Sequence, residues 1–220
     1  MTFEEIEDEA AHGNPEAQRV VGICYSTGDG AAQNYAEALK WYRKAAKQGD
    51  AGAECLLGLA YANGLGVEKD EAEAVTWYRK SAAKGEREGQ LQLGLCLCKG
   101  EGVAADSEEG FKWLKKAAER GDAYAQHNVA VCYYGGKGVA KDIVEAYAWG
   151  AVASLKDEFS ANLRDKLDEM MTPHQASAAR KRAKELREHL EAEEGPKNEF
   201  DRCQTRENPK KSRGEIFGTN

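Results

Sequence analysis

The sequence predicts an all-α protein made of four stacked helical hairpins. A step of 36 residues separates the members of three sets: Trp41, Trp77, Trp113 and Trp149; Gly28, Gly64, Gly100 and Gly136; and Gly30, Gly66, Gly102 and Gly138. Glycine is frequent (23 residues) and proline is scarce (4 residues), which is typical of helices separated by glycine turns. Self-similarity at such a period is the signature of a repeat architecture. The units span 14–49, 50–85, 86–121 and 122–157.

The first helix of each unit begins at a polar N-cap and ends at the glycine pair. Asn14 and Pro15 open the first unit with an N-cap and a proline at the first helical position. An aliphatic residue is followed three and four positions later by a small residue and by an aromatic or leucine: Val21, Cys24 and Tyr25; Leu57, Ala60 and Tyr61; Leu93, Cys96 and Leu97; Val129, Cys132 and Tyr133. These offsets define one buried helical face.

The second helix of each unit begins at Asn34, Asp70, Asp106 or Asp142, each followed by a glutamate three residues later. This is the spacing of a capping box. We expect a buried stripe along Ala38, Ala74, Gly110 and Ala146, which the four tryptophans continue. Glycine stops the helix in the first three units, and cations such as Lys84 and Arg120 complement its dipole.

Both ends of the repeat array carry the pattern of a cap. Thr2 and Glu5 have capping-box spacing, so residues 1–13 are predicted to form a half-repeat that shields the first unit. After the fourth unit, a C-terminal cap at 158–192 is predicted. Its first helix runs from about Phe159 to Met171, and its second begins at Thr172-Pro173 and ends near Ala192. Residues 193–220 have little hydrophobicity and no period, and we predict a disordered tail.

The segments WYRKAAKQG at 41–49 and LGLAYANGLGVEKD at 57–70 resemble the Sel-one-like repeat family, 36-residue relatives of the tetratricopeptide repeat. The resemblance covers 14–157. It implies a right-handed α-solenoid with helical caps that serves protein–protein assembly. The segment MTPHQ at 171–175 is similar to the terminal cap of bacterial members. Several residues depart from the family pattern and are expected to soften the third and fourth units without changing the fold: Gly89, Leu97, Gly110, Ala130 and Gly150.

Composition excludes several classes of protein. The net charge of −7 and the pI of about 5.3 argue against a chain built mainly to bind nucleic acid, because phosphate binding needs a basic surface. No run of 18 apolar residues exists that could span a membrane. The acidic start of the sequence lacks the apolar core of a secretory signal, so we expect a cytoplasmic protein with reduced thiols. Its oligomeric state stays open, with a monomer as the expectation.

The cysteines and histidines do not form a recognisable site. Cys24, Cys96 and Cys132 share the small interior slot that Ala60 fills in the second unit, so buried thiols are expected. Cys96 and Cys98 are two positions apart on a helix, point away from each other and are poorly placed to share a zinc ion. Cys203 lies in the predicted tail as a free thiol. No metal, cofactor or catalytic set is predicted.

Two other functions have a sequence basis. Ser81-Ala82-Ala83-Lys84 matches the S-x-x-K nucleophile motif of serine β-lactamases, but the companion motifs are missing and Ser81 occupies a packing position. Because some members of the resembled family are linked to penicillins, β-lactam binding or hydrolysis is the alternative function.

The basic run ARKRAKELREHL at 179–190 allows RNA binding, although it is typical of a charged cap surface. A basic stripe on the second helices is interpreted as a solvated outer face: Arg43, Lys44, Arg79, Lys80, Lys115 and Lys116.

The first helices carry an apolar row on the face opposite their core stripe: Ile23, Leu59, Leu95 and Val131. In the resembled family these helices line the concave wall, so the row could form the floor of a groove that binds a protein or peptide. Variable neighbours would then select the partner: Arg19, Asn63, Gln92, Lys99, His127, Asn128 and Tyr134. The alternative is that tight curvature packs the row between neighbouring helices. The predicted function is a non-enzymatic adaptor or scaffold.

Overall fold

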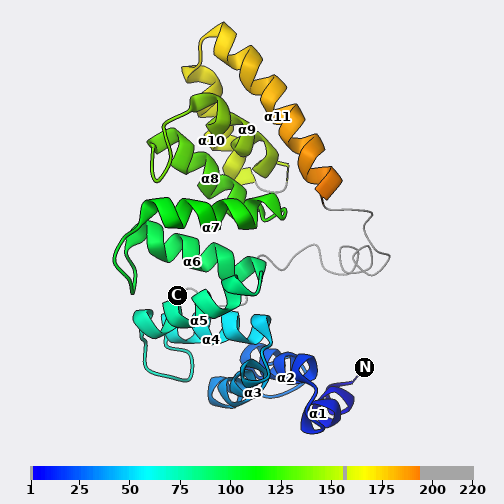
Figure 1. The fold of residues 1–220 in the computed structure, drawn as a ribbon. Helices are drawn as coiled ribbons and strands as arrows, with labels where there is room; N and C mark the ends of the chain where they lie inside the picture. Colours follow the sequence, from blue (N-terminus) through cyan, green and yellow to red (C-terminus); the bar gives the residue numbers. More distant parts are fainter. Residues whose placement is uncertain (1, 156–157, 194–220) are drawn as a thin grey trace.

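The computed structural model describes residues 2–155 and 158–193, which form eleven α-helices and no strand (Figure 1). Four hairpins follow one another, and the helices have these bounds: α2 (Pro15–Thr27) and α3 (Tyr35–Lys47); α4 (Ala51–Asn63) and α5 (Glu71–Ala83); α6 (Arg87–Lys99) and α7 (Ser107–Glu119); α8 (Ala123–Gly135) and α9 (Ile143–Ala153). Before them lies α1 (Phe3–Ala11), and after them lie α10 (Glu158–Met170) and α11 (Pro173–Glu193). The all-α solenoid is confirmed. The predicted disorder of the tail and Cys203 lie outside the described residues.

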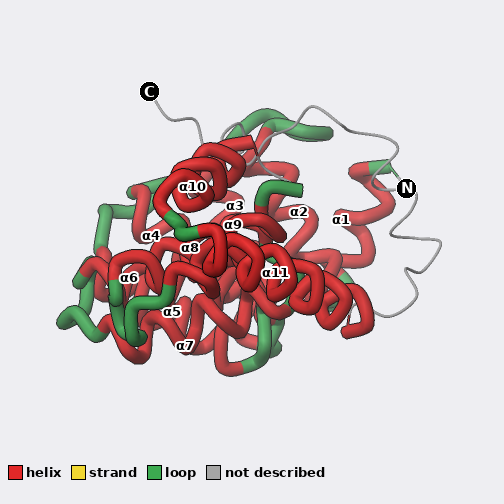
Figure 2. The backbone as a smooth tube through the Cα atoms, turned by 90° about the horizontal axis from the view of Figure 1, so that it is seen from above, coloured by secondary structure: helices red, strands yellow, loops and turns green. Residues whose placement is uncertain are grey.

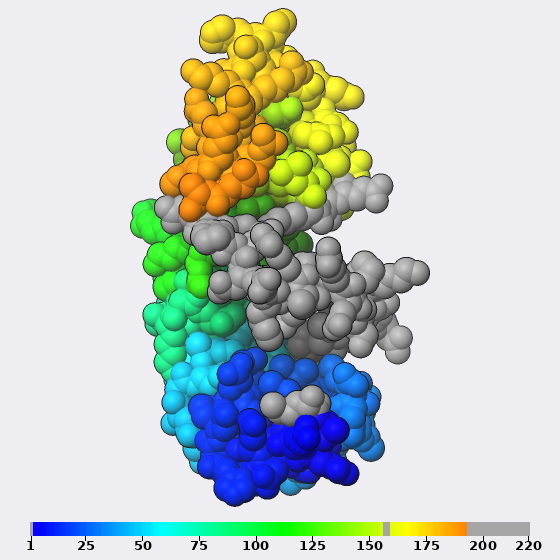
Figure 3. Space-filling model, turned by 90° about the vertical axis from the view of Figure 1, so that its right-hand side faces the viewer, coloured from blue at the N-terminus to red at the C-terminus, as the bar shows by residue number. Residues whose placement is uncertain are grey.

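The helices stack in chain order. Each helix of the four hairpins packs on the next one along the chain, both within a hairpin and between hairpins. The first helices α4 and α6 also contact each other directly. Both α10 and α11 pack on α9, so they cover the end of the stack (Figure 2). Figure 3 shows the described residues following one another along the stack, from the N-terminal residues (blue) through the middle repeats (cyan and green) to the C-terminal cap (yellow and orange).

The sequence sets the helix ends through polar caps and left-handed glycines. The side chain of Asn14 accepts hydrogen bonds from the backbone N–H groups of Glu16 and Ala17, and the aspartate caps at 50 and 122 bond in the same way. Glu86 caps α6 without a side-chain hydrogen bond. Each first helix ends at a glycine with φ between 68° and 80°. Side chains other than glycine strongly disfavour this conformation.

The first and last described helices both begin with a complete capping box. The backbone N–H of Thr2 donates to Glu5 Oε2 at 2.8 Å, and the N–H of Glu5 donates to Thr2 Oγ1 at 3.3 Å. Thr172 and Gln175 form the same reciprocal pair at the start of α11, at 3.0 and 3.3 Å. A capping box satisfies two backbone donors of the first turn at once.

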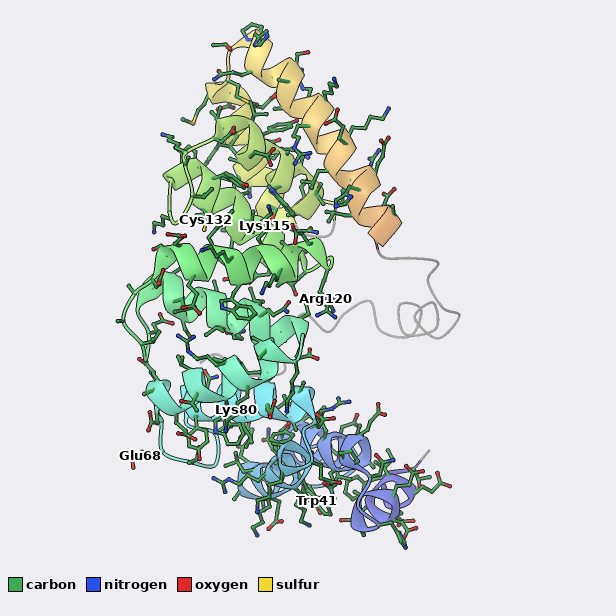
Figure 4. The ribbon with its side chains drawn as sticks, viewed as in Figure 1. Trp41, Glu68, Lys80, Lys115, Arg120 and Cys132 are labelled. Atoms are coloured by element: carbon green, nitrogen blue, oxygen red, sulfur yellow. The ribbon has the colours of Figure 1, made fainter. Side chains whose placement is uncertain are left out.

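A further contact ties each of the first three hairpins to the element before it. The Nζ atom of Lys84 donates to the carbonyl of Gly49 at 3.1 Å, and Gln48 Nε2 donates to the carbonyl of Gly13 at 3.0 Å. The guanidinium of Arg120, at the end of α7 in Figure 4, donates in the same way to the carbonyl of Gly85. Cations at these positions therefore bind the stop glycine of the preceding helix, in addition to their favourable place near a helix C-terminus.

Within the first three hairpins, one large and one small residue fit together at the helix crossing. A Cβ atom on Gly22 would lie 2.5 Å from the ring of Tyr42, and one on Gly58 would lie 2.5 Å from Tyr78. The third hairpin pairs Gly94 with Leu114. The fourth hairpin has two small residues at this crossing, because a Cβ atom on Gly150 would lie 3.9 Å from Ala130 Cβ. The departures Ala130 and Gly150 thus face each other across one helix crossing.

The two glycine departures of the third repeat also lie against side chains of neighbouring helices. A Cβ on Gly89 would overlap the hydroxyl of Ser81, and one on Gly110 would lie 2.6 Å from Cys98 Sγ. Other repeats place alanines at the positions of Gly89 and Gly110. Gly89 therefore makes room for Ser81 where other repeats pair two alanines, and Gly110 lies directly against Cys98.

The expectation that all four tryptophans are buried is wrong for three of them. Trp149 is 2% exposed, because α10 and α11 cover it. Trp41, Trp77 and Trp113 are half-buried, and the last two contact the core of the preceding repeat. The ammonium groups of Lys44, Lys80 and Lys116 lie over their rings, at 3.6, 3.8 and 4.1 Å from the centroids. Trp41 and Lys80 are labelled in Figure 4. The outer face is thus formed by cation–π pairs.

Candidate functional site

The apolar row on the first helices is neither fully buried nor fully exposed. Ile23, Leu59 and Leu95 each contact a core cluster while keeping part of their side chain accessible. Val131, the fourth member, is also half-buried. The row is therefore not fully enclosed by neighbouring helices, and its role as the floor of a binding groove stays a prediction. One side of each residue packs against neighbouring helices, and the other side is available at the surface.

Beside this row lies a pocket of about 280 Å³ between the second and third repeats, which we call the Tyr78 pocket. Helices α4, α5 and α6 and two adjoining turns line it: Leu59, Ala62, Asn63, Lys69, Glu71, Ala74, Tyr78, Gln92, Cys96 and Glu101. The pocket brings three predicted site residues together: Leu59, Asn63 and Gln92. Apolar side chains form one part of its lining, and polar side chains form the rest. This arrangement is typical of a site that holds an apolar side chain and orients it through a few polar groups.

A residue that differs between the first two repeats, Ala62 in the place of Ser26, lines this pocket. In the first repeat, the Tyr42 hydroxyl donates to Ser26 Oγ at 3.1 Å, and burial raises the pKa of Tyr42 to about 12. In the second repeat, Ala62 stands in the place of Ser26 and offers no hydroxyl. Tyr78 is 1% exposed, and burial raises its pKa far above the usual range. Its phenol therefore stays neutral and can act as a hydrogen-bond donor within the pocket.

The polar rim of the Tyr78 pocket carries both signs of charge. Lys69 pairs with Glu71 at 2.8 Å, and the hydrogen bond to Glu71 raises the pKa of Lys69. Gln92 Nε2 donates to Glu88 at 2.8 Å, and Asn63 Nδ2 donates to the carbonyl of Leu59 at 2.8 Å. These contacts join residues close in sequence and lie near the surface. A bound polypeptide could therefore replace them by its own polar contacts with little loss of free energy.

Three other predicted site residues lie at different places along the first helices. Lys99 is exposed and pairs with Glu101 at 3.5 Å, close to the pocket. Asn128 Nδ2 donates to the carbonyl of Tyr124 at 2.7 Å. Arg19 pairs with the N-cap carboxylate of Asp50 at 3.1 Å, so it joins the first two repeats.

The C-terminal cap contacts the remaining two predicted residues and buries one of them, His127. His127 is 8% exposed, lies 3.1 Å from Ser160 Oγ and stacks against Phe159 at a centroid distance of 4.9 Å. The Tyr134 hydroxyl lies 3.8 Å from Met170 Sδ and adjoins a 220 Å³ hollow beside α10. Both residues thus contact α10, which forms the end wall of the row of first helices.

Ser81 has no route to a substrate in this fold. Its side chain is 0% exposed, and its hydroxyl donates to the carbonyl of Ala51 at 2.7 Å. The ammonium of Lys84 points to Glu54 Oε1 at 2.7 Å and to Gly49, away from a role as a base. A nucleophile must reach its substrate, so the S-x-x-K match is a packing feature.

The basic run at 179–190 is largely neutralised. Its cations pair with carboxylates: Arg180 with Asp168, Lys181 with Glu185, Arg182 with Glu145, Lys184 with Glu188 and Arg187 with Glu191. Paired charges of this kind offer little net attraction for phosphates.

Among the residues that the structure describes, no group of three or more His, Cys, Asp or Glu side chains could hold a metal ion. In the same ranges, every helix is too short or too polar for a membrane crossing.

Sequence reasoning missed most of the Tyr78 pocket. It identified Leu59, Asn63 and Gln92 and noted the variable position of Ala62, but not Tyr78 or Glu101. The exchange of Ser26 for Ala62 beside a retained tyrosine was the available signal. It indicates that a hydroxyl partner present in the first repeat is missing in the second.

The fold and this surface define a helical repeat protein of the solenoid class. Comparison with protein families matches the Sel1 repeat at residues 15–50, 51–86, 87–122 and 123–156. The chain therefore belongs to the Sel1 repeat family. Proteins of this family generally mediate protein–protein interaction. Comparison with curated proteins gives no match.

Two solved structures are similar over most of the chain. One is the protective antigen c5321 of uropathogenic Escherichia coli, which displays an SLR fold; it is 35% identical, with a TM-score of 0.81. The similarity covers 96% of this chain and 44% of that one, so this chain spans less than half of the longer protein. The other is a Sel1 repeat protein from Oxalobacter formigenes, 29% identical with a TM-score of 0.70, covering 82% of this chain and 75% of that one.

Proposed function

We propose that this chain is a non-enzymatic adaptor that holds a segment of a protein partner along its first helices. An apolar side chain of the partner would enter the Tyr78 pocket. The observation that carries the proposal is the coincidence of this pocket with the half-exposed apolar row. The coarser property of the family, protein–protein interaction, supports it as well.

The energetics of this surface favour a polypeptide ligand. Full burial of a leucine side chain contributes about 1.5–3 kcal/mol, so covering the free side of a half-buried leucine contributes about 1 kcal/mol. Leu59 and Leu95 offer two such sites in adjacent repeats. The neutral phenol of Tyr78 and the amides of Asn63 and Gln92 can then bind backbone or polar groups of the partner. Apolar anchors with a polar rim are typical of peptide grooves.

The partner surface that we propose is narrower than the one that the sequence predicts. It centres on the apolar row together with Asn63, Gln92, Lys99 and Asn128, with Tyr134 at the edge of α10. Arg19 bonds to Asp50, and His127 is covered by α10, so these two residues support the stack in the free chain. They therefore lie outside the proposed contact.

Affinity capture from the protein's own cells, followed by mass spectrometry, tests the proposal. The double variant Leu59→Asp/Leu95→Asp should lose the protein that the wild type enriches, because each aspartate would put a charge into the apolar contact. Circular dichroism and thermal melting establish that the variant is folded. A partner that the double variant retains at wild-type level would refute binding at this surface.

A matched control carries the same two charges elsewhere. Ala72 and Thr76 are exposed on α5, so Ala72→Asp/Thr76→Asp changes the net charge by the same amount outside the proposed surface. This control should retain the partner. Its loss in both double variants would show that binding depends on net charge and not on the apolar row.

A further inference from the structure

Two thiols from different repeats meet at the boundary between the third and fourth repeats. Cys98 lies near the end of α6, and Cys132, labelled in Figure 4, lies on α8. The thiol of Cys132 donates a hydrogen bond to the sulfur of Cys98. Cys132 is 4% exposed within a core cluster, and Cys98 is half-buried against the same cluster. The two side chains are thus neighbours in one core cluster, although all of α7 separates them in sequence.

A comparison of the repeats shows that this contact is specific to one boundary. The position of Cys98 is occupied by Ser26, Ala62 and Tyr134 in the other repeats. The position of Cys132 is occupied by Cys24, Ala60 and Cys96. Among the four described repeats, only the third and fourth therefore bring two cysteines to these facing positions.

The packing around Cys98 is adapted to its sulfur. A Cβ on Gly110 would lie 2.6 Å from Cys98 Sγ, and the other repeats carry alanine at that position. Glycine is the poorer helix former, so α7 loses some intrinsic helix stability where it makes room for this thiol.

The environment makes Cys98 the more reactive thiol. The hydrogen bond from Cys132 lowers the pKa of Cys98, and the nearby Lys137 ammonium lowers it further, against the effect of burial. The same hydrogen bond raises the pKa of Cys132, and burial adds to that. The expectation of buried thiols is wrong for Cys24 and Cys96, which are half-buried. Their partial burial still raises the pKa of Cys24, and that of Cys96 to about 11. The thiolate is the nucleophile, so Cys98 should react first.

We propose that Cys98 and Cys132 are a redox-sensitive pair, in which hydrogen peroxide oxidises Cys98 and Cys132 then closes a disulfide between α6 and α8. The Cys98 thiolate attacks one peroxide oxygen, the O–O bond breaks, and the released hydroxide takes up a proton to form water. Cys98 is then a sulfenic acid. The sulfur of Cys132 loses its proton and attacks Cys98, the S–O bond breaks, and the hydroxyl leaves as a second water. Two thiols lose two electrons, and the peroxide is reduced.

This disulfide would join the first helices that carry Leu95 and Val131. A cross-link that closes a loop around α7 restricts the unfolded chain and so raises the melting temperature. The oxidised protein should therefore melt at a higher temperature than the reduced one, and a dithiol reductant should reverse the change.

The experiment uses the full chain with Cys203→Ser, since Cys203 lies outside the described residues. The protein is treated with hydrogen peroxide, alkylated under denaturing conditions, digested and analysed by mass spectrometry. The expected product is one peptide pair linked through Cys98 and Cys132, lighter by two hydrogens, with Cys24, Cys55 and Cys96 alkylated. Peroxide treatment that consumes thiols without producing this link would overturn the proposal.

Two variants that copy residues of other repeats separate the roles of the thiols. Cys132→Ala reproduces Ala60 and should leave a sulfenic acid on Cys98 that dimedone traps. Cys98→Ser reproduces Ser26 and should abolish both the link and the trapping at Cys132. Dimedone labelling of Cys24 or Cys96 as fast as Cys98 would contradict the assignment of Cys98 as the reactive thiol.

Discussion

Replacing Gly89 with alanine tests whether the third repeat is packed as described. A Cβ at this position would overlap Ser81 Oγ and lie 2.8 Å from Ser81 Cβ. Ser81 has no exposed surface and donates to the carbonyl of Ala51 at 2.7 Å, so it cannot turn away without losing that bond. We expect Gly89→Ala to destabilise the protein.

The magnitude follows from opposing effects. Overpacking a close-packed core costs about 1–3 kcal/mol. Alanine regains up to about 1 kcal/mol of helix propensity over glycine. The net loss for Gly89→Ala should therefore be about 1–2 kcal/mol. Ser81→Ala alone loses one buried hydrogen bond, which contributes about 1 kcal/mol.

The double variant Ser81→Ala/Gly89→Ala should be less destabilised than the sum of its parts by about 1–2 kcal/mol, because the closest clash is with the removed hydroxyl. It recreates the pairs Ala45–Ala53 and Ala117–Ala125, whose members are all 0% exposed. Urea unfolding followed by circular dichroism measures the free energies of unfolding. Strictly additive losses would refute the packing argument.

A reciprocal cycle in the first repeat provides the control. Ala45→Ser should destabilise the protein by overpacking, and Ala53→Gly in the same chain should recover part of that loss. If Ala53→Gly makes the Ala45→Ser variant less stable still, the proposed size complementarity does not govern this interface.

The remaining predictions concern aromatic residues. Trp149→Ala should lower the free energy of unfolding by about 3–5 kcal/mol, because the ring is fully buried. Trp77→Ala should lower it clearly less, because that ring is half-buried. Equal losses for the two variants in chemical denaturation would contradict this. Lys80→Gln should lower the free energy of unfolding by no more than about 1 kcal/mol, which is the range of an exposed cation–π pair. A larger loss would show that Lys80 does more than pair with Trp77. The pKa of Tyr42 is about 12 in the folded chain and about 10 in the unfolded chain, so stability should fall as the pH rises from 10 to 12. In Tyr42→Phe, the free energy of unfolding should fall less steeply over this pH range. An unchanged fall would refute the assignment of the effect to Tyr42.

The helices could be predicted from the sequence because their signals are local. Caps, stop glycines and the three-and-four spacing act within one helix, so the period of 36 residues places every hairpin. The departures could not be judged in the same way. Ser81 and Gly89 lie on different helices, so Gly89 is interpreted as a weakness until its contact with Ser81 is known.

The candidate site was only partly predictable for a related physical reason. The apolar row faces both the surface and the neighbouring first helices, and its pattern does not separate the two. The cap also folds back over the end of the array, which covers His127 and brings Tyr134 against α10. These contacts depend on tertiary arrangement and leave no periodic trace. The Tyr78 pocket depends in turn on the exchange of Ser26 for Ala62.

The affinity of the captured partner for a pocket-filling variant tests the proposed surface most directly. Ala62 is half-buried in the Tyr78 pocket, whereas Ala83 is exposed at the end of α5. Isothermal titration should show that Ala62→Met weakens binding about tenfold or more, equivalent to about 1.4 kcal/mol. Ala83→Met should bind as the wild type does. Equal affinity of the two variants would contradict recognition through this pocket.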